Sequence, residues 1–263
     1  MSHDLLEPDE PAPERVLRPD GASPLFLTAD HGGRAIPRRL ARLGVPDSEM
    51  ERHIAWDIGI AGVTERLSAL LDATAVFQAY SRLTIDCNRD PSWPSAMPAI
   101  SEYTRIPGNE GLTDADRAAR VNAIFTPYHN AIRDLLDARA ARRTLFVAMH
   151  SFTPSFKGEQ RAMQVGVLFN RDVRMANVML DLLRAEGDLT VGANEPYAIT
   201  DDSDYSVPVH AQARGLLHVE IEIRQDLIAS EAGQAAWAGR FARLLTAADR
   251  LLSNGIDTPR NTA

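Results

Sequence analysis

Cysteine is almost absent from this sequence, since Cys87 is the only one among 263 residues. A single thiol excludes a disulfide within the chain, and it also excludes a zinc site built from several thiolates. The same scarcity is compatible with the reducing cytoplasm. We therefore expect a cytoplasmic protein that does not depend on disulfides for its stability.

The sequence also lacks a basic surplus and any long apolar run. Its 28 Lys and Arg residues are outnumbered by 36 Asp and Glu residues, and the formal net charge is −8. Because phosphate binding requires clustered basic side chains, we expect no nucleic-acid partner. No stretch approaches the roughly 18 apolar residues of a membrane helix, so we expect no membrane partner either. A small anionic substrate remains compatible, because one arginine can reverse the field inside a pocket.

The order of apolar and polar segments predicts a domain that follows an arm. Residues 1–23 are acidic and rich in proline, which predicts an extended N-terminal arm. Residues 24–263 have the composition of one globular domain, large enough to bury a core. We therefore expect order to begin at Pro24 and a single domain to follow.

Within that domain, short apolar runs alternate with longer amphipathic segments, which is typical of an α/β sheet. The runs that predict strands cover 25–29, 74–80, 83–87, 144–150, 163–169 and 216–223, and the helical patterns cover 47–71, 113–143, 172–186 and 231–252. Residues 90–113 carry no sustained period and predict a long excursion, a kind of segment that is often functional. We predict one three-layer α/β/α domain with a mixed sheet.

Two of the predicted strands lead into a histidine. LFLTAD is followed by His31, and TLFVAM is followed by His150. Since active sites of open α/β sheets lie at the carboxyl ends of strands, these two imidazoles could face one another across a crevice. Two imidazoles and a carboxylate are a frequent zinc site. On the residues alone, an equally good interpretation is that each histidine caps its own strand.

The predicted strand at 216–223 is unusually polar on one face. Strand alternation places His218, Glu220, Glu222 and Arg224 together and puts apolar residues on the opposite face. Ionisable groups inside a sheet need a partner or a function, and a glutamate there could be the general base for a metal-activated water. An edge strand with its polar face in water explains the pattern equally well.

Asn88 and Arg89 close the run that starts at Tyr80. A guanidinium group binds a carboxylate bidentately and a neighbouring amide adds a donor, so this pair could bind a substrate carboxylate. The commoner explanation for such a pattern is that Arg89 forms an ion pair with a nearby acid, such as Asp86 or Asp90.

Seven short motifs, taken in order, resemble those of the N-formylglutamate amidohydrolase family over most of residues 24–229. Each motif is common by itself, whereas seven in the same order are a specific signal. The motifs are His31-Gly32-Gly33 with Ile36-Pro37, the segment from His53 through Asp57 to Gly59, Ser81-Arg82 through Asn88-Arg89, Tyr128-His129, His150-Ser151, Asn194 to Tyr197, and Glu222-Ile223-Arg224.

This resemblance implies the phosphorylase/hydrolase-like fold of the zinc carboxypeptidases and a role for each matching residue. His31 and His150 would be metal ligands, and Glu222 would be the general base. Asn88 and Arg89 would hold the carboxylate of the substrate. For His129 we prefer a packing role on its helix.

One departure from the carboxypeptidase pattern concerns the third metal ligand. Carboxypeptidases have a glutamate three residues after the first histidine, where this chain has Arg34. We choose Asp57 as the carboxylate ligand because it lies in a family-like motif. Asp86 and Glu220 are the alternatives.

The resulting hypothesis is a zinc-dependent amidohydrolase with one Zn²⁺ per chain. It would cleave the N-acyl amide of a small carboxylate-bearing substrate, and the family suggests N-formyl-L-glutamate and histidine degradation, with formate and glutamate as products. Arg82 would stabilise the oxyanion, and Tyr197 would close on the bound ligand. The same ligands would also accept cobalt, manganese or iron.

Two other functions remain as alternatives, and the sequence does not indicate an oligomeric state. The chain could be a catalytically silent binder of acylamino acids, or a hydrolase of another N-acyl amino acid. A serine hydrolase is disfavoured because no Gly-x-Ser-x-Gly elbow occurs. A nucleotide-dependent enzyme is disfavoured because neither Gly-x-Gly-x-x-Gly nor a Walker loop occurs.

Overall fold

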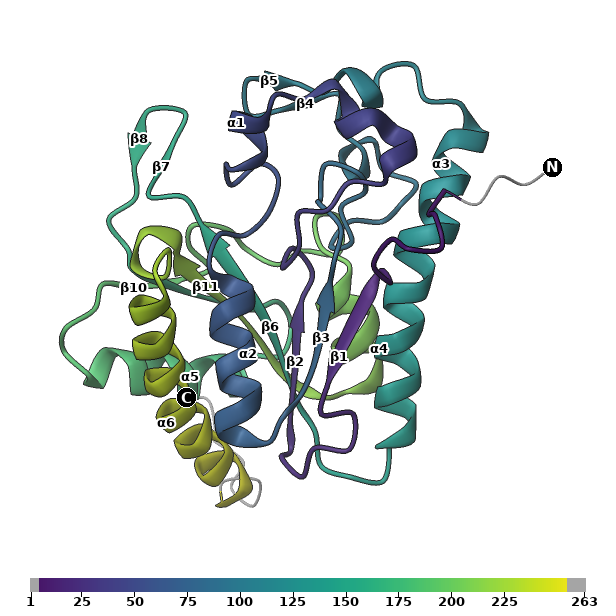
Figure 1. Ribbon diagram of the computed structural model, residues 1–263. Coiled ribbons are helices and arrows are strands. Elements are labelled where there is room, and N and C mark those ends of the chain that lie inside the picture. Colours follow the sequence, from purple (N-terminus) through teal and green to yellow (C-terminus); the bar gives the residue numbers. More distant parts are fainter. Residues whose placement is uncertain (1–4, 255–263) are drawn as a thin grey trace.

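The structure, a computed structural model that describes residues 5–254, is built on a seven-stranded mixed sheet with the order β1-β3-β2-β6-β11-β9-β10 (Figure 1). The central strands β3, β2, β6 and β11 are parallel, whereas β1 and β9 run antiparallel to β3 and β11. The strands are β1 (Glu14–Leu17), β2 (Leu25–Ala29), β3 (Thr74–Gln78), β6 (Leu145–Phe152), β9 (Val165–Leu168), β10 (Val191–Ala193) and β11 (Leu217–Arg224).

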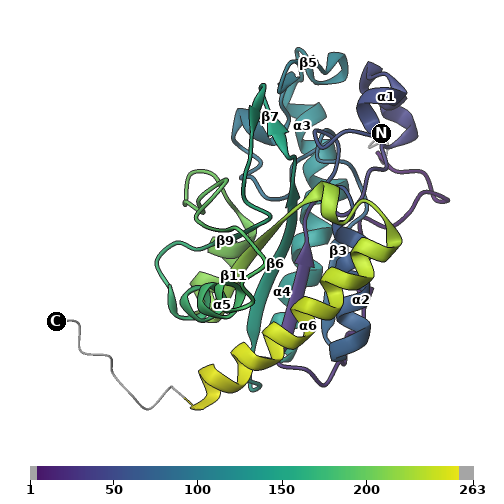
Figure 2. The ribbon, with the colours of Figure 1, turned by 90° about the vertical axis from the view of Figure 1, so that its left-hand side faces the viewer.

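Helices cover both faces of this sheet (Figure 2). Three helices pack on one face, and one helix with two π-helical turns packs on the other. The first group is α2 (Ile60–Leu71), α5 (Arg174–Ala185) and α6 (Glu231–Asn254); the second is the π-helical turn Val121–Phe125, α4 (Thr126–Ala138) and the π-helical turn Val207–Ala211. Helix α3 (Asp114–Arg120) leads into the first of these turns. The predicted α/β/α layering with a mixed sheet is confirmed.

The burial of strand β2 shows why the sequences of the central strands are continuously apolar. Leu25, Leu27 and Ala29 pack in the core beneath α2 and α6, whereas Phe26 packs on the side of α4. All five residues of the strand are buried. Burial on both faces requires an apolar side chain at nearly every position, which is typical of parallel strands.

The helix predicted over 113–143 forms, but it ends earlier. Thr113 and Asp116 make a capping box at its start, which satisfies two backbone N–H groups that have no partner inside the helix. The helix ends at Ala138, and Arg139 has a non-helical backbone conformation. The side chain of Arg139 donates a hydrogen bond to the backbone oxygen of Ser23, which connects the end of α4 to the segment before β2.

The strand predicted at 83–87 does not form. Its backbone makes a local turn instead, in which the N–H of Thr84 donates to the backbone oxygen of Ser81. Leu83 and Ile85 are nevertheless buried. Because these two side chains are buried, the sequence alternates as in a strand, and this alternation led to the wrong prediction of a strand.

The helix predicted over 47–71 is interrupted at residues 51–59, between the short helix α1 (Asp47–Met50) and α2. Gly59 has φ +81°, and a Cβ atom there would lie 2.1 Å from the backbone oxygen of Ile228. Only glycine fits such a position, and a helix cannot continue through it. The interruption leaves Asp57 in an irregular segment.

The extended arm predicted for residues 1–23 is in part a strand of the sheet. β1 pairs with β3 along its length, with Val16 opposite Val76, and Leu5 is buried. Order therefore begins before Pro24. Residues 1–4 of the predicted arm and 255–263 of the predicted domain lie outside the described residues.

The predicted excursion at 90–113 contains short turns and the two-residue strands β4 (Ile100–Ser101) and β5 (Thr104–Arg105). It lies at the end of the molecule where the central parallel strands finish, as does the hairpin of β7 (Ser155–Phe156) and β8 (Glu159–Gln160) (Figure 1). The two segments touch, because the N–H of Lys157 donates to Glu102 at 3.4 Å. Among residues 5–254, the helices are too short or too polar to cross a bilayer.

Candidate metal centre

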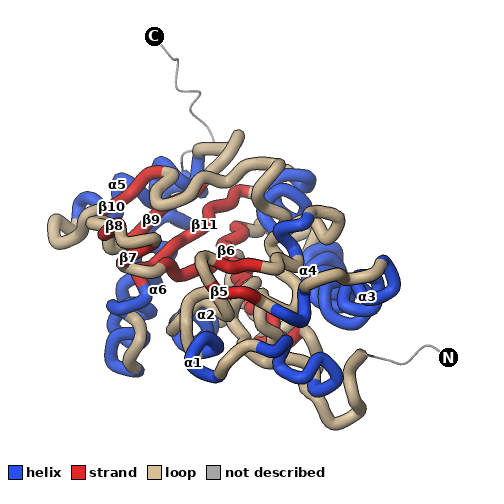
Figure 3. The backbone as a smooth tube through the Cα atoms, turned by 90° about the horizontal axis from the view of Figure 1, so that it is seen from above, coloured by secondary structure: helices blue, strands red, loops and turns tan. Residues whose placement is uncertain are grey.

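The carboxyl ends of β2, β6 and β11 meet at one edge of the sheet because these three strands are parallel neighbours. Figure 3 looks down on the molecule from this side and shows β6 beside β11. His31 follows β2, His150 lies in β6, and Glu222 of β11 stands opposite His150 in the register. A cavity of about 320 Å³ opens here. All three residues line it, so the topology alone gathers side chains that are far apart in the sequence.

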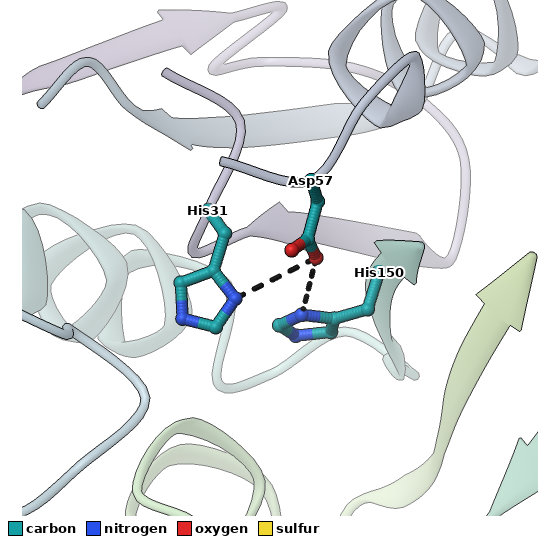
Figure 4. A group of neighbouring side chains, drawn as sticks. All are labelled: His31, Asp57 and His150. Carbon is teal, nitrogen blue, oxygen red and sulfur yellow. Dashed lines mark hydrogen bonds and ion pairs between the residues drawn. The ribbon is translucent and has the colours of Figure 1, made fainter. Parts of the chain in front are cut away.

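Three possible metal-ligand atoms lie together at the base of this cavity (Figure 4). Oδ2 of Asp57 is 3.5 Å from Nδ1 of His31 and 3.0 Å from Nδ1 of His150. The ligand atoms of the three residues all lie within 4.8 Å of one another. Two imidazoles and one carboxylate are the protein ligands of a catalytic zinc that keeps one position open. His31, Asp57 and His150 could therefore hold a metal ion.

The opposite nitrogen of each imidazole faces another carboxylate. Nε2 of His31 lies 2.7 Å from Oδ1 of Asp86, and Nε2 of His150 lies 3.4 Å from Oδ2 of Asp30. Partners of this kind orient metal-binding histidines and leave the other ring nitrogen for the metal. Asp86, one of the alternative third ligands, thus contacts the far side of the His31 ring.

The environment of Nδ1 of His31 is a second observation that fits a bound cation. Among the described residues, Nδ1 of His31 is buried and has no hydrogen-bond partner. A buried polar atom without a partner requires an explanation such as a bound ion. A metal ion bound between the three ligand atoms would supply the missing contact.

Asp57 is held in place from two strand ends. Its backbone N–H donates to the backbone oxygen of His31 at 2.9 Å, and its Oδ2 accepts a hydrogen bond from the N–H of Ser151 at 3.1 Å. The carboxylate is thereby fixed between the two histidines although its own segment is irregular. By contrast, Arg34 is half-exposed and forms an ion pair with Glu51.

Neighbouring charges favour the ionised forms of Asp57 and His150. Burial opposes ionisation of Asp57, but the two imidazoles outweigh burial and lower the pKa of this carboxyl. Burial likewise opposes the charged form of His150, but Glu220, Asp30 and Asp57 outweigh it and raise the pKa of His150 well above its usual value. A metal ion at this position would displace the protons on the imidazoles.

Glu220 and Glu222 share one face of β11 and line the cavity, while Ile221 and Ile223 pack in the core on the other face. The predicted alternation is therefore confirmed, and β11 is an interior strand rather than an edge strand. Burial raises the pKa of each glutamate to about 8. Among residues 5–254, Oε2 of each glutamate finds no hydrogen-bond partner. A buried carboxyl of this kind is suited to accepting and releasing a proton.

Arg82 lines the cavity and is anchored to the acids around the triad. Its Nη2 lies 2.6 Å from Oδ2 of Asp86, and its Nη1 lies 3.6 Å from Oδ1 of Asp57. About a quarter of its side chain, 26%, is still exposed. The guanidinium group is thus fixed at the cavity wall while it remains accessible to a ligand.

Asn88 and Arg89 also line the cavity, but much of their bonding is to the loop at 203–206. Oδ1 of Asn88 accepts hydrogen bonds from two backbone N–H groups of this loop, and its Nδ2 donates to Asp204 at 3.1 Å. Arg89 donates to a backbone oxygen of the loop and lies 3.6 Å from Asp204. Asn88 is 3% exposed, whereas the Arg89 side chain is 27% exposed. Arg89 is the more accessible of the two.

Tyr197 lies at the mouth of the cavity, 44% exposed. Its hydroxyl oxygen accepts a hydrogen bond from Arg161 at 2.9 Å, and the guanidinium group of Arg161 lies 4.8 Å from the centre of its ring. Sequence reasoning did not single out Arg161, which follows the β8 strand without any motif. It also passed over His53, a wall residue of the same cavity, although His53 opens one of the recognised motifs.

His129 is buried away from this cavity. Its Nδ1 lies 2.9 Å from Nε2 of His210, and its Nε2 lies 2.9 Å from the backbone oxygen of Cys87. Burial lowers the pKa of His129 to about 4 and that of His210 to about 3. Two neutral, stacked imidazoles between helices agree with a packing role.

Comparison with known proteins identifies a family and several similar solved structures. The family model described as N-formylglutamate amidohydrolase matches residues 23–229. Gene product Atu2144 from Agrobacterium tumefaciens has a similar crystal structure, with a TM-score of 0.91 and 38% identity over 95% of this chain and 99% of that chain. N-formylglutamate amidohydrolase from Ralstonia eutropha JMP134 has the same fold, with a TM-score of 0.63 and 20% identity over 93% of this chain and 100% of that chain. No curated protein matches the chain.

Proposed function

The chain belongs to the N-formylglutamate amidohydrolase family, and from this premise we propose that it is a zinc-dependent amidohydrolase acting on N-acyl amino acids. The observation that carries this proposal is the triad of His31, Asp57 and His150 beside the buried carboxyl of Glu222. N-formyl-L-glutamate, with formate and glutamate as products, is the first substrate to test because the family description names it.

In this proposal His31, Asp57 and His150 would hold the zinc ion, since Nδ1 of each histidine faces Oδ2 of Asp57 in the cavity. A zinc ion held there would polarise a carbonyl group and lower the pKa of a water molecule. Asp86 and Asp30 hold the two imidazoles in the required orientation.

Glu222 is the general base in this reaction. It takes the proton of the attacking water and later delivers it to the nitrogen of the leaving amine, so that one carboxyl group acts in both steps. Burial raises its pKa to about 8, and a nearby cation favours the carboxylate form that can accept the proton. Glu222 stands opposite His150 in the sheet register, whereas Glu220 lies 4.0 Å from Nε2 of His150, the ring nitrogen away from Asp57, and this difference supports Glu222 as the base.

Two arginines bind the substrate in this proposal. Arg82 is fixed by Asp86 at the cavity wall, and it donates to the oxygen of the carbonyl group that is attacked. Arg89 keeps an accessible face and binds the substrate carboxylate. Asn88 supports that subsite by holding the loop at 203–206, and Tyr197 covers the mouth when the ligand is bound.

Metal depletion and reconstitution test the proposal against the silent binder. The protein is stripped of metal with a chelator, zinc is added back, and formate released from N-formyl-L-glutamate and N-formylglycine is measured. We expect loss of hydrolysis on stripping and its recovery with zinc. An unchanged rate after complete stripping, or binding of both compounds by the zinc-loaded protein without hydrolysis, would contradict the proposal.

A further inference from the structure

A second cavity of about 460 Å³ adjoins the one that contains the triad. The two cavities share four wall residues, which are His53, Arg82, Arg89 and Tyr197. The second one extends between the irregular segment before α2, the excursion at 90–113 and the β7 strand. The metal centre therefore opens into a larger space than a formyl group requires.

The charged residues that line the second cavity but not the first are both acids. Asp86 is bound by Arg82, and Glu102 forms an ion pair with Arg52. The two arginines of the wall, Arg82 and Arg89, stand on the boundary with the first cavity. The apolar wall residues are Ile54, Leu83, Pro98, Ile100 and Phe156.

The position of the reacting groups determines which half of the substrate enters this space. Glu222 and His150 line only the first cavity, so the bond that is cleaved lies there. A carboxylate bound by Arg89 lies on the boundary. The α-carbon that carries this carboxylate is one bond from the leaving nitrogen, so its side chain starts at the boundary, within reach of the second cavity.

We propose that the substrate is an N-acyl amino acid with an apolar or aromatic side chain, which the second cavity receives. The inference rests on the proposed function, because it takes the triad as the place of amide cleavage. A glutamate side chain would bring a second carboxylate past the two boundary arginines toward the acids Asp86 and Glu102, where it would lose hydration without gaining a cation. A leucine or phenylalanine side chain would bury apolar surface there instead.

A substrate series tests this inference separately from the proposed function. The zinc-loaded protein is assayed for kcat/KM with N-formyl derivatives of glycine, L-glutamate, L-leucine and L-phenylalanine. N-formylglycine has no side chain, so its hydrolysis tests only the metal-dependent reaction. We expect the leucine and phenylalanine derivatives to exceed both others by about tenfold or more. A preference for glutamate, or equal values for all four, would overturn the inference while the proposed function stands, and hydrolysis of none of the four would refute both.

A second substrate series varies the acyl group and keeps the amino acid constant. N-formyl-, N-acetyl- and N-hexanoylglycine differ only in the acyl group. We expect the formyl derivative to be hydrolysed at least as well as the longer ones. A marked preference for the hexanoyl group would place the acyl half in the second cavity and overturn the inference.

A variant tests the cavity wall itself. Ile100 is 64% exposed, so Ile100→Glu adds a charge to the wall without disturbing the core. We expect kcat/KM for N-formyl-L-phenylalanine to fall about tenfold and that for N-formylglycine to stay unchanged. Leu70→Glu is the matched control, because Leu70 is 61% exposed on α2 and lines neither cavity. Equal values for wild type and Ile100→Glu with the phenylalanine substrate would contradict the assignment, as would an equal fall for both substrates.

Discussion

Nδ1 of His150 lies 3.0 Å from Oδ2 of Asp57, although the two residues are 93 positions apart. The contact depends on the end of a buried strand and on an irregular segment that interrupts a helical pattern. It makes the carboxylate the shared partner of both histidines, since His31 approaches the same oxygen. Asp57 is therefore the residue on which metal binding should depend most.

Asp57→Asn should remove most of the bound metal. The amide keeps the size of the carboxyl group but loses the negative charge that attracts the cation and stabilises the imidazoles. We expect the zinc content, measured by elemental analysis after reconstitution, to fall below about a tenth of the wild-type value. Asp47→Asn, at a strongly exposed acid, is the control. A full zinc content in Asp57→Asn would assign the carboxylate ligand elsewhere.

Asp30→Asn should weaken metal binding without removing a ligand. Asp30 contacts Nε2 of His150 and also accepts hydrogen bonds from Tyr128 and Ser206. Loss of such a partner usually lowers metal affinity by about 10- to 100-fold. Competition with a chelator measures this change, and Tyr128→Phe should have a smaller effect because it leaves the carboxylate in place. An unchanged affinity in Asp30→Asn would mean that the contact does not orient His150.

Glu222→Gln should keep the metal and lose turnover. The amide cannot accept a proton, and general-base catalysis contributes about 10²- to 10⁴-fold to the rate. Single-turnover rates measured alongside zinc content separate chemistry from metal loss. Glu220→Gln, at the neighbouring buried glutamate on the same face, should lose much less. A wild-type rate in Glu222→Gln, or a larger loss in Glu220→Gln, would show that the base is assigned to the wrong residue.

Substitution of Asn88 should affect stability, whereas substitution of its neighbour Arg89 should affect substrate binding. Asn88→Ala leaves a buried and a partly buried backbone N–H group of the 203–206 loop without their acceptor, which should cost about 1–3 kcal/mol of unfolding free energy. Arg89→Ala should instead raise KM about tenfold or more with little change in kcat, because it removes a contact with the bound carboxylate. Urea unfolding and steady-state kinetics distinguish the two. A large stability loss in Arg89→Ala with KM unchanged would make Arg89 a structural residue.

The buried pair of His129 and His210 should make the protein less stable at mildly acidic pH. Burial lowers the pKa values to about 4 and about 3, below the usual value of about 6.5. The unfolded chain therefore binds more protons below about pH 6.5, so stability is complete above that pH and falls as the pH drops toward the folded-state values. We expect a loss of about 4 kcal/mol between pH 7 and pH 5, about 2 kcal/mol from each histidine, measured by urea unfolding. His210→Asn should reduce this dependence, and an identical dependence in the variant would contradict the account.

The parts of the molecule that could be predicted from sequence are those governed by local patterns. Continuous apolar runs identified β2 and β6 because both faces of these strands are buried, and alternation identified the polar face of β11. The irregular path around Asp57 could not be predicted from periodicity, because it depends on Gly59 packing against Ile228. The bonding of Asn88 depends equally on tertiary contacts with a loop more than a hundred residues away.

The second cavity could not be predicted from the sequence for a similar reason. The excursion at 90–113 was identified as a long segment without a period, but its position over the metal centre depends on long-range contacts. Arg52 donates to Glu102 and Thr104 in this excursion, and Lys157 of the neighbouring hairpin also contacts Glu102. Contacts of this kind leave no pattern in the local sequence.

The most direct test of the metal-dependent site is a zinc titration of the metal-free protein with amide hydrolysis as the signal. Formate release from N-formylglycine and N-formyl-L-phenylalanine is measured as zinc is added to the wild type and to Asp57→Asn. The account predicts a rate that rises with zinc and saturates at about one ion per chain in the wild type, with almost no rate in the variant. Hydrolysis that does not depend on zinc, or that rises equally in Asp57→Asn, would contradict it.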